Sequence, residues 1–97
     1  MAKNKLRRFA EMKVMPNVFE PTVDEIKSDS VDFKGKWNST VFKNDFPITL
    51  ELGCGKGEYS VGLAKKYPKR NFIGVDIKGS RMWVGAAEAM ELELDNV

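Results

Sequence analysis

The second half of the chain carries the clearest pattern of apolar and polar positions. Residues 48–52 read Ile-Thr-Leu-Glu-Leu, a run of strand-forming residues that Pro47 precedes and a cluster of glycines follows. Residues 71–76 read Asn-Phe-Ile-Gly-Val-Asp and repeat this signature. Short apolar runs between turn residues are typical of buried parallel strands. We therefore predict two such strands, over 48–52 and 71–76.

Apolar residues with helical spacing occur between the two predicted strands and again after the second. Over residues 58–66 an apolar or aromatic residue recurs every four positions, and Pro68 ends the pattern. Beyond Gly79, Ser80 is predicted to cap a second helix that runs to about Asp95. The order strand, helix, strand, helix predicts an α/β fold, the opening half of a doubly wound, Rossmann-like parallel sheet. The side chains expected to pack are Tyr59, Leu63, Tyr67, Phe72, Met82, Trp83, Ala86, Ala87, Met90 and Leu94.

Residues 1–47 lack a comparable pattern. Three prolines, scattered acids and no sustained period of 3.6 or 2 predict irregular structure with short helical turns over 15–47. We therefore divide the chain into a basic arm with an irregular N-terminal extension, residues 1–47, and an α/β part, residues 48–97. The apolar side chains expected to anchor the extension are Trp37, Val41, Phe42 and Phe46.

Composition narrows the function classes. A chain of 97 residues holds one domain at most, because domains commonly contain about 100–150 residues. The sequence has no histidine, which excludes Ser-His and Cys-His hydrolases and histidine-bound metals. Its one cysteine, Cys54, has no partner for an internal disulfide or a zinc cluster and no base to make it a nucleophile. The chain has no long apolar run, so we expect a cytoplasmic protein that does not bind a membrane. Because it lacks histidine and has one cysteine, we also expect no metal.

Positive charge is concentrated at the N-terminus. The formal net charge is only +2, whereas residues 1–13, the basic arm, hold five basic residues against Glu11 alone. Clusters of Lys and Arg neutralise nucleic-acid phosphates, but they are also common at solvated chain ends. Both interpretations stay open. If the arm contacts RNA, the residues expected to do so are Lys3, Lys5, Arg7 and Arg8.

We expect a ligand-binding site in the turn after the first strand, Gly53-Cys54-Gly55-Lys56-Gly57. Glycines at alternate positions let the backbone adopt positive φ and let a ligand approach where a Cβ would collide. The helix that follows offers free N–H groups. Asp76 ends the neighbouring strand, where its carboxylate can accept hydrogen bonds from both hydroxyls of a ribose. This constellation predicts a nucleoside ligand.

Two common nucleotide motifs fit this turn poorly. A P-loop needs Gly-Lys-Ser/Thr, which occurs nowhere in the chain. A dinucleotide fingerprint needs glycine at position 58, where Glu58 would face a pyrophosphate with like charge, so NAD is disfavoured but stays open. Glu51, at the tip of the first strand, suits a ligand with positive charge and no phosphate. S-Adenosylmethionine, with a sulfonium and an ammonium, is such a ligand.

Three segments together resemble a known family. The pattern Glu-x-Gly-x-Gly-x-Gly and the Val-Asp that ends the second strand are similar to motifs I and II of the class I S-adenosylmethionine-dependent methyltransferases. Residues 3–9, 50–60 and 73–83 resemble the tRNA (guanine-N(7)-)-methyltransferases more specifically. The resemblance implies transfer of a methyl group from S-adenosylmethionine to a guanine in the variable loop of tRNA. The cofactor-binding residues that it implies are Glu51, Gly53, Gly55, Gly57 and Asp76.

The resemblance also implies that part of such an enzyme lies outside these residues. Family members continue into further strands and an acidic residue at the guanine, so we expect residues 48–97 to be the N-terminal part of a truncated cofactor-binding domain without a catalytic residue. Two strands leave a sheet edge that a further segment or self-association would cover. Three hypotheses remain: a tRNA methyltransferase, an NAD-dependent dehydrogenase and a non-catalytic RNA-binding piece that uses the arm.

Overall fold

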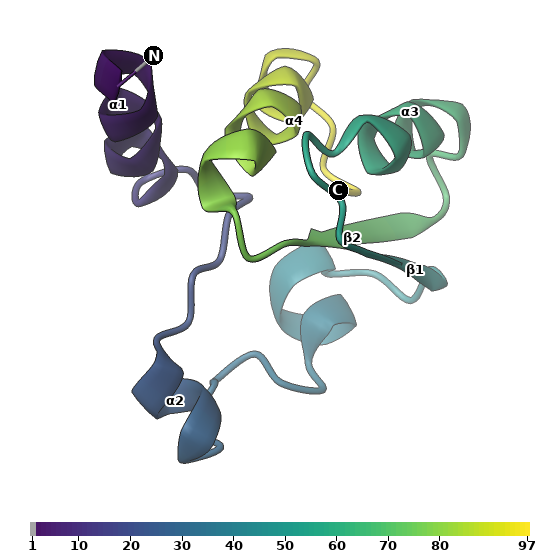
Figure 1. Ribbon diagram of the computed structural model, residues 1–97. Coiled ribbons are helices and arrows are strands. Elements are labelled where there is room, and N and C mark those ends of the chain that lie inside the picture. The colour runs from purple at the N-terminus through teal and green to yellow at the C-terminus, as the bar shows by residue number, and fades with distance from the viewer. Residues whose placement is uncertain (1) are drawn as a thin grey trace.

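Two parallel strands form the sheet of this α/β chain (Figure 1). A computed structural model describes the backbone of residues 2–97 and the side chains of residues 4–97. Strand β1 (Ile48–Leu52), helix α3 (Glu58–Lys66), strand β2 (Asn71–Val75) and helix α4 (Gly79–Glu91) follow one another along the chain. In Figure 1, α3 and α4 lie above the sheet, and α3 packs against both β2 and α4. None of the described helices is long and apolar enough to cross a membrane.

Both predicted strands are present, but β1 is exposed. The strands pair in parallel, with Leu50 beside Ile73 at the centre of the register. Leu50 and Leu52 are 54% and 76% exposed, so the prediction of a buried strand is wrong for β1. Among the described residues β1 pairs with β2 alone, which leaves its outer edge open. Whether a segment forms a strand depends largely on local residue preference, whereas the burial of that strand depends on what packs beside it.

Helix α3 faces the sheet with small side chains. Its buried residues are Ser60, Val61 and Ala64, whereas Tyr59 is 76% exposed. The predicted packing is therefore wrong for Tyr59 and for Tyr67, which is 38% exposed, whereas Leu63 is half-buried. The small residues share one helical face and let α3 approach β2 closely. Phe72 of β2, by contrast, is buried as predicted.

Helix α4 begins and ends earlier than predicted. Lys78 occupies the N-cap position and its side chain forms no capping bond, so the prediction of Ser80 as the cap is wrong. The chain is already helical at Gly79, which places Ser80 inside the first turn. The helix ends at Glu91, because the segment that follows turns back to α3. There, Asn96 Nδ2 donates a hydrogen bond to the Ala64 carbonyl at 3.0 Å.

The basic arm is helical, which contradicts the prediction of an irregular extension at this end. Helix α1 (Ala2–Met12) packs against α4. Met12 is 1% exposed, and Trp83 Nε1 of α4 donates a hydrogen bond to Glu11 at 2.6 Å. Phe9 and Met12 lie one helical turn apart and face the first turn of α4 together. This short apolar stripe was not recognised in the sequence because charged residues surround it.

Residues 15–47 match the prediction of irregular structure with short helical turns. Helix α2 (Val23–Lys27) is capped reciprocally by Thr22 and Glu25. The π-helical segment η1 (Trp37–Phe42) follows it and lies below the sheet in Figure 1. The η1 part of this segment therefore lies against the sheet without adding a strand to it.

Two clusters hold this segment in place. Trp37 packs with Phe19 and Phe33, at ring-centroid distances of 5.3 and 4.8 Å. Asn71, at the start of β2, is fully buried and donates a hydrogen bond to Asn38 of η1 at 2.9 Å. Trp37 was predicted to anchor the extension on the residues that follow it. Its ring instead packs inside the extension, against two phenylalanines that the sequence does not single out.

Candidate functional site

The glycine-rich turn joins β1 to α3. Gly53, Gly55 and Gly57 have φ values of 67°, 55° and 75°, so all three adopt the left-handed backbone that the sequence predicts. The Cys54 N–H donates to the Val75 carbonyl at 3.0 Å, which ties the turn to the end of β2. A Cβ on Gly53 or Gly55 would meet none of the described atoms within 4 Å. The space in front of the turn is therefore open to a ligand.

Gly85, in the middle of α4, lets the turn pack against that helix. A Cβ at this position would overlap the Lys56 carbonyl oxygen and lie 3.2 Å from Gly57 Cα. Every other residue type carries a Cβ, so no other residue fits without a backbone shift. This role of Gly85 was not predicted from the sequence. Its signal is a glycine inside a helix, where glycine is unfavourable unless close packing requires it.

Asp76 follows β2 and braces the turn. Its Oδ2 accepts the Gly55 N–H at 2.8 Å, and its Oδ1 accepts the Lys78 N–H at 2.9 Å. The bond from Lys78 and then that from Gly55 hold the pKa of the carboxyl below its ordinary value, so Asp76 is ionised at neutral pH. A carboxylate oxygen can accept more than one hydrogen bond, so both retain capacity for a ligand hydroxyl. The bracing contacts were not predicted.

Glu51 lies near the end of β1 and is oriented by α3. Its Oε1 accepts the Ser60 hydroxyl at 2.7 Å, and Ser60 is 4% exposed. A strand and a helix thus fix this carboxylate jointly, and its remaining acceptor capacity is available to a cationic group. This contact of Ser60 was not predicted from the sequence. A hydroxyl on the buried face of that helix is the signal that could have revealed the contact.

Cys54 lies near both carboxylates. Burial raises the pKa of its thiol, and the negative charges of Glu51 and Asp76 raise that pKa further. Its side chain fits beside Gly74 of β2, where a Cβ would lie 2.9 Å from the sulfur. A raised pKa makes a thiol a poor nucleophile at neutral pH, in agreement with Cys54 as a small packing residue. The described residues contain no group of three His, Cys, Asp or Glu side chains that could hold a metal ion.

The residues predicted to contact RNA belong to α1. The Lys3 side chain lies outside the described residues, and Lys5 is exposed. Arg7 and Arg8 lie over the ring of Trp83, with their Cζ atoms 5.7 and 4.7 Å from the ring centroid. Cation–π contacts of this kind stabilise by about 0.5–1 kcal/mol at exposed sites. The two arginines therefore help to hold α1 on α4, a role that the sequence analysis did not foresee.

Known proteins match this sequence along nearly all of its length. Residues 45–97 match a family model described as "Putative methyltransferase". A tRNA (guanine-N(7)-)-methyltransferase of Christiangramia forsetii is 57% identical over 96 residues, which are 99% of this chain and 43% of that protein. Proteins of the same name from Bacteroides fragilis and Bacillus subtilis are 54% and 43% identical, over 100% and 72% of this chain and 38% and 32% of theirs.

These matches confirm the resemblance drawn from the motifs. The chain spans about two fifths of the length of the Christiangramia and Bacteroides relatives and corresponds to their N-terminal part. The matched family segment contains β1, the glycine turn, α3, β2 and α4. Because that segment makes up more than half of the chain, the chain belongs to this methyltransferase family.

Proposed function

We propose that these residues form part of the S-adenosylmethionine site of an enzyme that transfers a methyl group to N7 of a guanine in tRNA. The observation that carries this proposal is the left-handed glycine turn, with Glu51 and Asp76 at the ends of two parallel strands beside it. The names of the relatives supply the tRNA substrate. In this proposal the β1–α3–β2–α4 unit is the opening half of a doubly wound class I methyltransferase sheet.

The residues of the turn fit this cofactor. Open space in front of Gly53 and Gly55 lets a nucleoside approach the backbone closely, and Gly57 turns the chain into α3. The ionised Asp76 is suited to accept the ribose hydroxyls, and Glu51 is suited to a cationic group. S-Adenosylmethionine supplies an electrophilic methyl group when it is bound. We assign no catalytic residue to residues 1–97, whose part is to bind and orient.

Glu58 argues against a dinucleotide cofactor. It is the first residue of α3 and is exposed at the N-terminus of that helix. A pyrophosphate at this helix end would meet the Glu58 carboxylate, and like charges repel. S-Adenosylmethionine has no phosphate, so the same carboxylate does not oppose it. An RNA-binding piece that uses α1 alone would leave the geometry of the turn unexplained.

The positive charge of α1 supports tRNA as the partner. The proposed phosphate contacts on this helix are Lys3, Lys5, Arg7 and Arg8, of which the two arginines also dock α1 on Trp83. Arginine can stack on a ring and still present N–H groups to an anion. Docking therefore positions these charges next to α4 instead of leaving them on a free chain end.

Calorimetry with two ligands tests the cofactor. We expect the protein to bind S-adenosylhomocysteine, the demethylated product, and not NADH. A chimera tests the reaction: residues 1–97 replace the matching segment of the Christiangramia forsetii relative, with which they share 57% identity. The folded chimera should transfer labelled methyl groups from S-adenosylmethionine to tRNA. Preference for NADH, or a folded chimera without transfer, would contradict the proposal.

A further inference from the structure

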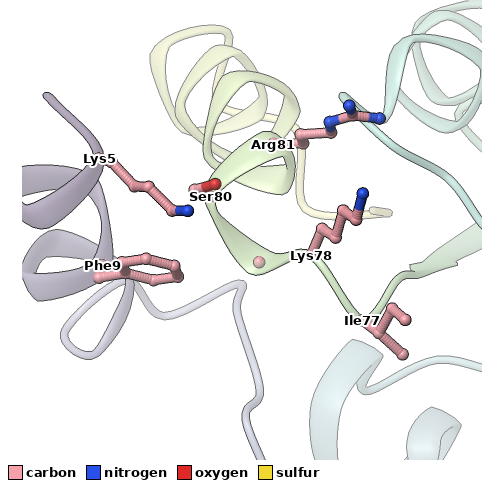
Figure 2. Close-up of a pocket in the computed structure, with 7 residues that line it drawn as sticks. Lys5, Phe9, Ile77, Lys78, Ser80 and Arg81 are labelled. Carbon is pink, nitrogen blue, oxygen red and sulfur yellow. The ribbon is translucent and has the colours of Figure 1, made fainter. Parts of the chain in front are cut away.

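A cleft of about 440 Å³ lies between α1 and the start of α4 (Figure 2). Lys5 and Phe9 of α1 line one wall, and residues 77–81 line the other. The lining includes neither Glu51 nor any glycine of the turn, so this cleft is distinct from the candidate cofactor site. It owes its existence to the docking of α1, which the sequence analysis did not predict.

The cleft is cationic. Lys5, Lys78 and Arg81 are all exposed, and among the described residues none of the three forms an ion pair. Of the side chains that the structure describes, no acidic one lines the cleft or belongs to the first turn of α4. Two carboxylates lie close to the lining residues. Asp76 Oδ1 accepts the Lys78 N–H at 2.9 Å, and Glu20 Oε2 lies 3.9 Å from where a Cβ of Gly79 would stand. Positive charge therefore exceeds negative charge at this place.

The cations lie on both sides of the first turn of α4 and not around one point (Figure 2). Figure 2 shows Lys5 and Phe9 extending from α1 toward the first turn of α4, where Ser80 lies. In the same view, Lys78 and Arg81 extend from that turn on the side away from α1. A single small anion would not contact charges spread in this way. A chain of phosphates would, because its charges repeat along its length.

The position of the cleft connects it to the cofactor site. Lys78, on its wall, donates its N–H to Asp76, the carboxylate assigned to the ribose. A polymer held in the cleft would thus lie beside the methyl donor. We propose that the cleft binds the sugar–phosphate backbone of the substrate RNA next to the nucleotide that is methylated. This inference rests on the proposed function and adds Lys78 and Arg81 to the contacts assigned to α1.

A charge-matched pair of variants tests the cleft. The cleft variant carries Lys5→Gln, Lys78→Gln and Arg81→Gln. The control carries Lys13→Gln, Lys36→Gln and Lys69→Gln, which remove the same charge from exposed side chains outside the cleft. The affinity for an unmodified tRNA transcript is measured between about 50 and 200 mM salt, the range over which counterion release is large. Circular dichroism checks that both variants are folded.

The cleft variant should lose at least about tenfold more tRNA affinity than the control at the lower salt concentration. The slope of log affinity against log salt should fall by about 0.7–0.9 for each phosphate that the variant no longer neutralises. Equal losses and equal slopes in the two variants would overturn the inference. So would a wild-type protein that binds no tRNA at the lower salt concentration.

A third variant should act in the opposite direction. Glu20→Gln removes the carboxylate near Gly79 and should strengthen tRNA binding by about two- to threefold at low salt. Misfolding cannot produce tighter binding through the cleft. Unchanged or weaker binding by this variant in its folded form would count against the inference.

Titration with S-adenosylhomocysteine separates this inference from the proposed function. If the cleft variant binds the cofactor product like the wild type and keeps its tRNA affinity, the cleft inference alone fails. If tRNA binding depends on the cleft but no variant binds S-adenosylhomocysteine, the cleft inference holds and the cofactor assignment fails.

Discussion

The glycine turn and the cleft hold their charged groups in different ways. Asp76 accepts two backbone N–H groups and Glu51 accepts the hydroxyl of buried Ser60, so both carboxylates are fixed. The cations of the cleft are exposed and, within the described residues, free of ion pairs. Fixed acceptors suit a small ligand whose polar groups have set positions, whereas exposed cations suit a polyanion that can adjust. The turn therefore provides geometric selectivity, and the cleft provides affinity that salt weakens.

Gly85→Ala should disrupt the glycine turn more than the other substitutions proposed below. The new Cβ would overlap the Lys56 carbonyl oxygen, so the turn must move away from α4. Overpacking of this kind costs roughly 1–3 kcal/mol of stability. Because Gly55 and Gly57 belong to the displaced turn, we also expect binding of S-adenosylhomocysteine to be abolished. Urea unfolding and calorimetry measure the two effects.

Gly62→Ala is the matched control for this substitution. Gly62 lies in α3, is exposed, and a Cβ there would meet none of the described atoms within 4 Å. Alanine is favoured over glycine inside a helix by about 1 kcal/mol, so this variant should be as stable as the wild type or more so. Equal behaviour of the Gly85 and Gly62 variants would show that the contact between α4 and the turn is unimportant.

Asp76→Asn should weaken the cofactor site while it spares the cleft. The amide keeps the shape of the side chain but lacks the negative charge that strengthens hydrogen bonds from N–H groups and hydroxyls. Affinity for S-adenosylhomocysteine should fall by about tenfold or more. The tRNA affinity should not fall, since the carboxylate does not line the cleft and the substitution leaves its three cations in place. Asp95→Asn, an exposed change near the end of the chain, serves as the control.

Asp76 should also affect how the free energy of unfolding changes at acidic pH. The pKa of Asp76 is lowered in the folded chain by the bonds from Lys78 and Gly55. Its stabilising effect is therefore present above the ordinary carboxyl pKa, about 3.9, and is lost as the pH falls through the lowered value. The difference in urea midpoint between wild type and Asp76→Asn should shrink below about pH 4. A difference that grows there would contradict the lowered pKa.

The turn was predictable because its requirements are local. Alternating glycines, a preceding strand and an acid at the end of the next strand each depend on neighbours in sequence, and Gly53, Gly55 and Gly57 adopt the expected backbone. The docking of α1 was not predictable, because it depends on Trp83 of α4, which lies 72 residues from its partner Glu11. Burial of β1 failed as a prediction for the same reason, since it depends on what else pairs with the strand.

Glu11→Gln should loosen the helix that forms one wall of the cleft. The Glu11 carboxylate accepts the Trp83 N–H at 2.6 Å and lies 3.6 Å from Arg7. Weakening this partly exposed hydrogen bond should cost about 1 kcal/mol. Hydrogen exchange should accelerate over α1 more than over α3, and tRNA affinity should fall about two- to fivefold with cofactor affinity unchanged. Glu91→Gln, an exposed change at the end of α4, should move neither.

The smallest expected effect lies in the chemistry of Cys54, which reports on the carboxylates directly. Burial, then Glu51, then Asp76 raise the pKa of its thiol, so the thiolate fraction at pH 8 is below that of an ordinary cysteine. Iodoacetamide should therefore modify the folded chain more slowly than the urea-unfolded chain. Asp76→Asn removes one of the two charges and should accelerate modification by a few-fold, since burial remains the larger cause. Glu58→Gln removes an exposed charge at the start of α3 and should leave the rate unchanged. If Asp76→Asn does not alter the modification rate, the carboxylate and the thiol are not held close together. The glycine turn would then not hold the Asp76 carboxylate in the fixed position described above.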